Sequence, residues 1–284
     1  MNEKFLTVFH YCNVEVFHSI MKFYTLRLTD IQNSNDLVER IWIEEKIQKQ
    51  VIDKINGLRG ITEEEKSLVN NNFNIAKEVF QDNSRLYASC FSENGDLLSQ
   101  WRAYADNGQG LSIGFSKEAL DTFNKEMYGM KFLPVCYDED TQNEYAKEQA
   151  NSIVESILEG DSIFHAVSEV YENKVSEYSR MKNPMFKEEQ EWRLSILMSP
   201  ECRINNKAYF DKCTLSEIKT YCNKKKILTY FDLNFQDKKN GLINEIVIGP
   251  KCGMSERDVK QILFLWGYDV SSIAVRKSKV PYNR

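Results

Sequence analysis

The chain is poor in the residues that build metal sites and disulfide frameworks. Its 284 residues include seven cysteines and three histidines. The cysteines are odd in number and widely scattered, and no Cys-x-x-Cys pair occurs. This pattern argues against a zinc site with the usual spacing and against a disulfide framework. We therefore expect no metal site, and a reduced, cytoplasmic protein of bacterial type.

Long hydrophobic runs and an excess of positive charge are also missing. No stretch approaches the roughly 20 apolar residues that a membrane helix requires, and residues 1–12 lack the apolar core of a secretory signal. A net charge of −5 argues against a protein that coats nucleic acid by bulk electrostatics. With 42% hydrophobic and 28% charged residues, the composition is typical of a globular protein.

Strand-like and helix-like patterns are interleaved along the chain, with no repeat and no low-complexity linker. Segments rich in β-branched and aromatic residues, or with alternating polarity, predict short strands. These strands are Phe5–Tyr11, Thr25–Thr29, Leu86–Ser92, Leu111–Phe115, Glu189–Met198, Ile227–Leu233, Glu245–Ile248 and Ile273–Val275. Helices are predicted after Asn13, over Leu97–Asp106 with Asp96 as the N-cap, and over Ser255–Leu265.

Two longer helical stretches, at about residues 37–83 and 140–181, have the character of insertions. We expect the first pair of helices to pack on a core that resumes near Arg85. The whole chain, 1–284, is then predicted to be a single α+β domain, with a mixed sheet of short strands and helical insertions.

The segment 186–193 (FKEEQEWR) carries the most concentrated chemistry. It places Glu189, Glu191 and Arg193 at every second position before an apolar run. On a strand these three side chains would share one face. Two carboxylates and a guanidinium are costly to bury, so the pattern suits a site that stabilises developing positive charge. A solvated edge strand with an ordinary Glu–Arg pair is the alternative interpretation.

Several short motifs recur in a fixed order and carry a resemblance to a known family. They are Phe9-His10-Tyr11-Cys12, Asn35-Asp36, Cys90-Phe91-Ser92, Trp101-x-x-Tyr104-Ala105, Gly110–Phe115, Glu191-x-Arg193 and Ile248-Gly249-Pro250. In this combination the chain resembles the uncharacterised bacterial family known as domain of unknown function 2971, over nearly its whole length. That resemblance implies no particular activity.

More distantly, the order of these elements is similar to the ADP-ribosyltransferase fold in its histidine–tyrosine–glutamate branch. The resemblance implies that His10 holds a ribose hydroxyl of NAD, Tyr104 stacks on nicotinamide, and Glu191 stabilises the ribosyl cation. It further implies that Tyr11, Ser92 and Trp101 line the ligand pocket. The sequence departs from that branch at Cys12, where Ser or Thr is common, and at Trp101, where a small residue is expected.

This resemblance implies an enzyme that cleaves the nicotinamide–ribose bond of NAD and transfers ADP-ribose to an unknown macromolecular acceptor or to water. Glu189 is then the candidate general base, and Arg193 either binds a phosphate or holds Glu191 in place. A toxin or a phage-defence effector is the expected setting, by analogy. Two alternatives remain open: a binding module that senses a nucleotide without consuming it, and a metal-dependent nuclease-like effector that uses Glu189, Glu191 and Asp36.

Overall fold

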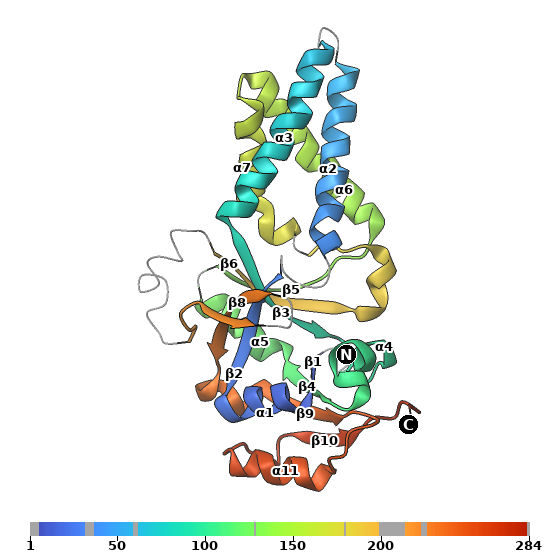
Figure 1. Ribbon diagram of the computed structural model, residues 1–284, viewed down its shortest axis with the longest axis vertical. Helices are drawn as coiled ribbons and strands as arrows, with labels where there is room; N and C mark the ends of the chain where they lie inside the picture. Colours follow the sequence, from blue (N-terminus) through green and yellow to red (C-terminus); the bar gives the residue numbers. More distant parts are fainter. Residues whose placement is uncertain are drawn as a thin grey trace.

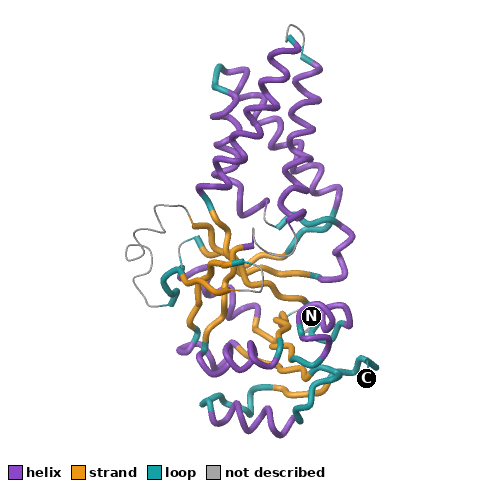
Figure 2. Tube along the Cα trace, viewed as in Figure 1, coloured by secondary structure: helices purple, strands orange, loops and turns teal. Residues whose placement is uncertain are grey.

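The computed structural model describes residues 6–31, 37–58, 62–127, 129–178, 180–198, 214–222 and 226–282. The Asn35-Asp36 turn, with the acidic residue considered for a nuclease, lies outside these residues. The molecule is elongated: a set of helices stands at one end of a mixed sheet, and further helices cover the sheet at the other end (Figure 1). Figure 2 shows the same division between purple helices and orange strands. The α+β class predicted from the sequence is confirmed.

Ten strands of the described part of the chain form one mixed sheet. Eight of them follow the order β10-β9-β4-β1-β3-β2-β8-β7, while β6 pairs with the other edge of β3 and β5 pairs with β6. Only the β10–β9 pair, among the described pairs, is parallel. The strands are β1 (Thr7–Cys12), β2 (Thr25–Asp30), β3 (Arg85–Ser92), β4 (Leu111–Ser116), β5 (Met130–Pro134), β6 (Glu191–Met198), β7 (Lys219–Cys222), β8 (Ile227–Asn234), β9 (Ile243–Ile248) and β10 (Ala274–Lys277).

Strand β3 lies at the branch point of this sheet. One of its edges pairs with β6 along all eight residues, from Arg85 to Ser92. The opposite edge is shared: β2 pairs with it at Tyr87 and Ala88, and β1 pairs with it at Ser92. Strands β1 and β2 therefore diverge from the same edge, and Ser89 to Phe91 lie between their two points of attachment. This divergence places β1 in one half of the sheet and β2 in the other.

Helices cover both faces of the sheet. Helix α1 (Val14–Phe23) begins after Asn13, whose side chain accepts a hydrogen bond from the backbone N–H of Val16, as predicted. Together with α5 (Lys117–Glu126) and α11 (Glu256–Leu265), it contributes to the main core. On the opposite face, Trp101 of α4 (Leu98–Tyr104) and the C-cap residue Ala105 pack against Phe9 and Tyr11 of β1. A one-turn helix, α10 (Lys239–Leu242), precedes β9.

Both predicted insertions are helical, and they pack on each other. They supply α2 (Leu37–Gly57), α3 (Glu63–Asn83), α6 (Glu139–Glu159) and α7 (Ile163–Tyr178), which we call the four-helix unit. Its core is separate from that of the sheet and includes Ile43, Phe73, Ile153 and Val167. The first pair was predicted as an insertion or subdomain, and its buried apolar residues belong to this separate core. Each pair has an apolar face that the other pair covers, α2 against α6 and α3 against α7.

Two local predictions need correction. The strand expected from Glu189 begins at Glu191, because Pro184–Glu189 forms a 3-10 helix, η4, that ends at Gln190 with a positive φ of 45°. Asp96 does not cap α4; the residue at that position is Leu97, which makes no capping hydrogen bond. The carboxylate of Asp96 accepts hydrogen bonds from elsewhere in the chain instead.

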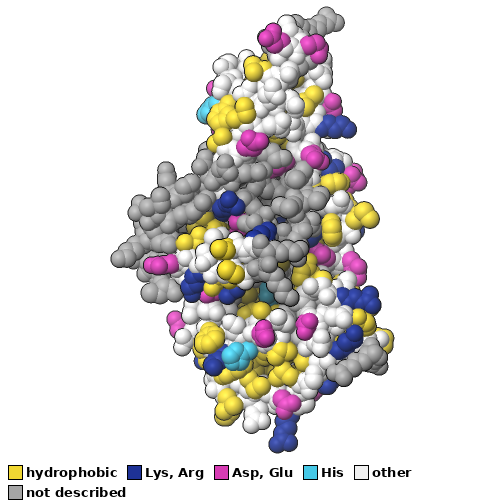
Figure 3. Space-filling model, viewed as in Figure 1, with side chains coloured by type: hydrophobic (Ala, Val, Ile, Leu, Met, Phe, Trp, Pro, Cys, Tyr) yellow, Lys and Arg dark blue, Asp and Glu magenta, His cyan; other side chains and the backbone are white. Residues whose placement is uncertain are grey.

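No helix among the described residues is long and apolar enough to cross a membrane. The five cysteines in the described part of the chain are free thiols: Cys12, Cys90, Cys136, Cys222 and Cys252. On the face of the molecule shown in Figure 3, basic and acidic side chains are interspersed among the described residues.

Candidate functional site

Glu191 begins strand β6 and lies in a dense ionic cluster. Its Oε1 accepts a hydrogen bond of 2.6 Å from Nε of Arg193, and its Oε2 accepts one of 3.0 Å from Nη2 of the same guanidinium. The Nζ of Lys182 lies 3.2 Å from Oε2. Glu191 and Arg193 do share one strand face, and Arg193 holds the carboxylate in place. Two roles were considered for Arg193, binding a phosphate and holding Glu191 in place, and this contact corresponds to the latter.

The cluster keeps Glu191 ionised. Burial alone would raise the pKa of this carboxyl group, since only 7% of the residue is exposed. The charges of Arg193 and Lys182 and hydrogen bonds from Arg193 and Cys90 outweigh burial, and they lower the pKa of Glu191 to about 2. The carboxylate is therefore negatively charged throughout the physiological pH range.

Glu189 reaches the same cluster from η4 rather than from the strand. Its Oε2 lies 2.6 Å from Nζ of Lys182, and its side chain is 19% exposed. The Lys182 ammonium thus bridges the two carboxylates, and it also lies over the ring of Phe186 at 4.8 Å from the centroid. The two acids considered for catalysis are close together, joined by a buried cation that the sequence did not single out.

His10 lies where β1 leaves the edge of β3. Its Nδ1 is 2.9 Å from the backbone oxygen of Cys90. A carbonyl oxygen can only accept a hydrogen bond, so Nδ1 carries the proton. Desolvation lowers the pKa of His10, against the opposing effect of that hydrogen bond.

The neutral, half-buried ring of His10 packs edge-to-face on Phe91 at a centroid distance of 5.9 Å. Because Phe9 pairs with Ser92 and Ser92 with Glu191, strand alternation places His10 on the main-core face, opposite to Glu191. The structure therefore does not bring His10 into one pocket with Glu191, although the resemblance implied it.

Tyr104, at the end of α4, faces the ionic cluster. Its side chain is 51% exposed. Partial burial raises the pKa of Tyr104 to about 12, and the charges of Glu189 and Glu191 add to this while Lys182 opposes it. Tyr104 is thus a neutral, accessible aromatic side chain beside both acids.

Cys90 of β3 lies opposite Arg193 of β6, although sequence reasoning gave it no role. Its backbone oxygen accepts a hydrogen bond from His10, and its thiol forms a hydrogen bond with Glu191. The residue is exposed. Strand alternation offers the only signal for it: Cys90 lies two positions before Ser92, so both side chains point to the same face of β3.

The other three predicted pocket residues are held in the protein interior. Trp101 has no exposed surface and packs edge-to-face on Tyr11 at a centroid distance of 4.8 Å. The hydroxyl of Tyr11 donates to the backbone oxygen of Asn94 and accepts from the backbone N–H of Leu97. Ser92 is buried, and its hydroxyl accepts from the N–H of Asn94. These contacts hold the turn before α4, so all three residues stabilise the helix that carries Tyr104 and do not line an open pocket.

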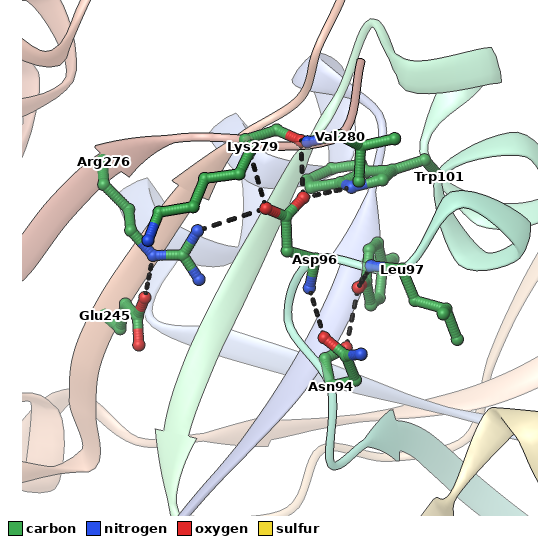
Figure 4. A network of polar contacts seen from close by, with 10 residues as sticks. Asn94, Asp96, Leu97, Trp101, Glu245, Arg276, Lys279 and Val280 are labelled. Carbon is green, nitrogen blue, oxygen red and sulfur yellow. Dashed lines mark hydrogen bonds and ion pairs between the residues drawn. The ribbon is translucent and has the colours of Figure 1, made fainter. Parts of the chain in front are cut away.

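The C-terminal segment fixes α4 through Asp96 (Figure 4). The carboxylate of Asp96 accepts hydrogen bonds from Nε1 of Trp101 (2.8 Å) and from the backbone N–H of Lys279 (2.7 Å). Ser278 and Arg276 also contact it. Burial raises the pKa of Asp96, but these hydrogen bonds and the Arg276 charge outweigh it, so the pKa is lowered. The helix that carries Tyr104 is thereby tied to the end of the chain.

Residues missed by sequence reasoning complete the surroundings of Glu191. The phenol oxygen of Tyr137 accepts a hydrogen bond of 3.2 Å from the backbone N–H of Glu191. Burial, the charge of Glu191 and that of Glu189 raise the pKa of Tyr137 despite opposing effects of this hydrogen bond and of Lys182. Neither Tyr137 nor Lys182 has a sequence signal, because both lie in irregular segments. Among the described residues, no group of three or more His, Cys, Asp or Glu side chains could hold a metal ion.

Comparison with known proteins relates one segment of the chain to a family. A model of the family described as a protein of unknown function (DUF2971) matches residues 100–194. The chain is similar to that family over this segment, which runs from Gln100, next to Trp101, through Tyr104 and Lys182 to Glu191 and Arg193. His10 and Cys90 lie outside the matched segment. No curated protein and no solved structure gives a match.

Proposed function

We propose that this protein cleaves the nicotinamide–ribose bond of NAD and transfers ADP-ribose to an acceptor or to water. The observation that carries the proposal is the buried ionic cluster of Glu191, Arg193 and Lys182, with the accessible Tyr104 beside it. Glu191 comes from β6 and Tyr104 from α4, and the charges of Glu189 and Glu191 act on the Tyr104 phenol. The family match leaves the activity open, so the proposal depends on this geometry and on the chemistry of these side chains.

The reaction needs a fixed negative charge. When the bond between the ribose C1′ and the nicotinamide nitrogen breaks, its electron pair leaves with nicotinamide, and positive charge develops on the ribose. Glu191, with its pKa lowered to about 2, is ionised before the substrate arrives. A preorganised charge of this kind contributes most in the transition state, and a single such contact is worth about 3 kcal/mol.

The neighbouring side chains suit the remaining steps. The His10 ring lies on the opposite face of the sheet from Glu191, so the ribose-binding role implied for it is not part of this proposal. The half-exposed ring of Tyr104 can stack on the nicotinamide ring. As the oxygen of the acceptor hydroxyl or of water bonds to C1′, Glu189 can accept the proton that this oxygen loses. This step requires that substrate binding loosen the contact between Glu189 and Lys182.

The test is incubation with NAD and chromatographic detection of free nicotinamide. Glu191→Gln keeps the shape of the side chain and removes its charge, so we expect release to fall by about 100-fold or more. Glu155→Gln makes the same change at an exposed position of α6 and should release nicotinamide at the wild-type rate. Equal release by wild type and Glu191→Gln, or no release with any acceptor, would reject the proposal.

A nucleotide-sensing module is the second candidate, and one observation favours it. Both oxygens of Glu191 are already engaged by Arg193 and Lys182. A site of this kind can bind a nucleotide without supplying a free carboxylate to the ribose. Titration calorimetry with NAD separates the two candidates, because the sensor binds intact NAD and leaves it unconsumed.

The proposed setting is the bacterial cytoplasm, where NAD is abundant. Consumption of NAD, or modification of an essential acceptor, would suit a toxin or a phage-defence effector, and this rests on analogy. Induced expression of the wild type and of Glu191→Gln in a bacterial host tests it: growth arrest with a falling NAD pool is expected for the wild type alone.

A further inference from the structure

Gln142 is a buried amide that joins three segments of the chain. It lies near the start of α6 and has no exposed surface. Its Nε2 donates to the backbone oxygens of Cys136 and Lys182, each at 2.8 Å. Its Oε1 accepts a hydrogen bond of 2.8 Å from Nε1 of Trp42 on α2. Both N–H donors and the oxygen of the amide are therefore in use.

The two carbonyl groups held by Gln142 belong to the two ends of the second helical insertion. Cys136 precedes α6 and Lys182 follows α7, and the two segments are joined by the hydrogen bond from the N–H of Lys182 to the oxygen of Cys136 (3.1 Å). Gln142 thus lies where the four-helix unit meets the sheet. Trp42 extends the connection to the first insertion.

The segments around Cys136 and Lys182 also contact Glu191. The N–H of Val135 donates to the backbone oxygen of Glu191 at 2.8 Å, and the phenol oxygen of Tyr137 accepts from its N–H. The Nζ of Lys182 contacts its carboxylate. The backbone oxygen, backbone N–H and side chain of Glu191 are all held by residues next to the carbonyl groups that Gln142 binds.

We propose that Gln142 and Lys182 are positioning residues through which the four-helix unit sets the Glu191 carboxylate. A partner or ligand that shifts α2 or α6 would then change the site from a distance. The consequence for NAD turnover rests on the proposed function, whereas the coupling itself can be measured without it. The physical reason is that a fully buried amide with its donors and acceptor engaged allows little movement, because any displacement leaves buried polar groups unpaired.

Gln142→Met tests the coupling. Methionine has a similar length and fills the space, but it provides no hydrogen bonds to the two carbonyl groups or to Trp42. Lys182→Met removes the cation itself and therefore sets the largest shift expected in the Glu191 titration. Ile153→Val alters the buried core of the same unit without touching a polar group, and it serves as the matched control.

The first measurement is the titration of the Glu191 carboxyl carbon by NMR, with ¹³C-labelled glutamate and Glu191→Gln for assignment. The ionisable groups that interact with this carboxylate are Cys90 of β3, Arg193 of β6, Glu189 of η4, Tyr104 of α4, Tyr137 and Lys182. A cation at this distance lowers the pKa of a carboxyl group by about 1–3 units. Lys182→Met should therefore raise the pKa by about one unit or more, Gln142→Met should raise it by a smaller amount, and Ile153→Val should leave it unchanged.

The second measurement uses the exposed thiol of Cys90, which is hydrogen-bonded to Glu191. Its rate of alkylation by iodoacetamide, followed by peptide mass spectrometry, should change by about threefold or more in Gln142→Met and remain at the wild-type value in Ile153→Val. Trp42→Phe breaks only the indole contact, so it should change both readouts in the same direction and keeps the test available if Gln142→Met fails to fold.

The proposal is overturned if Lys182→Met shifts the Glu191 titration while Gln142→Met and Trp42→Phe do not. With NAD, we expect Gln142→Met to lower kcat by about tenfold with little change in KM. If the wild type releases no nicotinamide, the proposed function fails, and the titration and alkylation results still decide whether the coupling exists.

Discussion

The ionic cluster around Glu191 makes a prediction about acid stability. The pKa of this carboxyl group is about 2 in the folded protein, compared with an ordinary value of 4.5. In the unfolded chain its partners are absent, so the unfolded state binds a proton at a higher pH than the folded state does. The ion pairs therefore stabilise the fold fully above pH 4.5, and this contribution is lost as the pH falls toward 2.

The magnitude follows from the difference between the two pKa values. Each pKa unit corresponds to about 1.4 kcal/mol, so ionised Glu191 contributes about 3 kcal/mol to the free energy of unfolding at neutral pH. The residue is 7% exposed, so solvent screening reduces this value little. Glu191→Gln cannot titrate and should lack this part of the pH dependence.

The assay is urea denaturation of wild type and Glu191→Gln at several pH values between 6 and 2. The difference between their free energies of unfolding should shrink by about 3 kcal/mol over this range. The carboxylates whose pKa is also lowered, Asp96, Asp121, Asp138, Asp258 and Asp269, are present in both proteins and cancel in the difference. A difference that stays constant within about 1 kcal/mol would refute the reasoning that Arg193 and Lys182 hold the carboxylate ionised.

Three further substitutions test the contacts that shape the site, each by urea denaturation at pH 7. His10→Ala removes the hydrogen-bond partner of the Cys90 oxygen and should cost about 1–3 kcal/mol, whereas His165→Ala, at an exposed position of α7, should cost little. Asp96→Ala leaves the buried Trp101 indole without its acceptor and should cost a similar amount, whereas no comparable loss is expected for Asp121→Ala. Gly249→Ala would place a Cβ atom 2.5 Å from the backbone oxygen of Gly108 and should cost about 1–3 kcal/mol, while Gly253→Ala has open space and should be neutral. If His10→Ala, Asp96→Ala or Gly249→Ala left the stability unchanged, the contact tested by that substitution would not stabilise the fold.

Periodicity in the sequence was sufficient for most of the elements. The helix repeat of 3.6 residues predicted a buried face of Val16, Phe17, Ile20 and Met21 for α1. The last three are buried, whereas Val16 is 42% exposed. The paired position of Glu191 and Arg193 followed from strand alternation. The same rule failed at Glu189, because the 3-10 turn before β6 depends on Asn183, Pro184 and the left-handed Gln190.

Contacts between segments distant in the chain could not be predicted from the sequence. Trp101 has the spacing of a helix residue facing inward, but only the fold shows that it packs on Tyr11 and binds Asp96. Lys182 lies in an irregular segment with no periodicity, and its place between two carboxylates results from the ends of the second helical insertion meeting beside β6.

The sequence by itself determined the class of the fold, the helical character of both insertions and the chemistry concentrated at the start of β6. These features depend on neighbouring residues, whose backbone preferences and apolar spacing are local properties. Only the tertiary structure decided that β1 and β2 diverge from one edge of β3, and that Lys182 lies between Glu189 and Glu191. Strand pairing joins residues far apart in the chain, and no local pattern specifies which edges will meet.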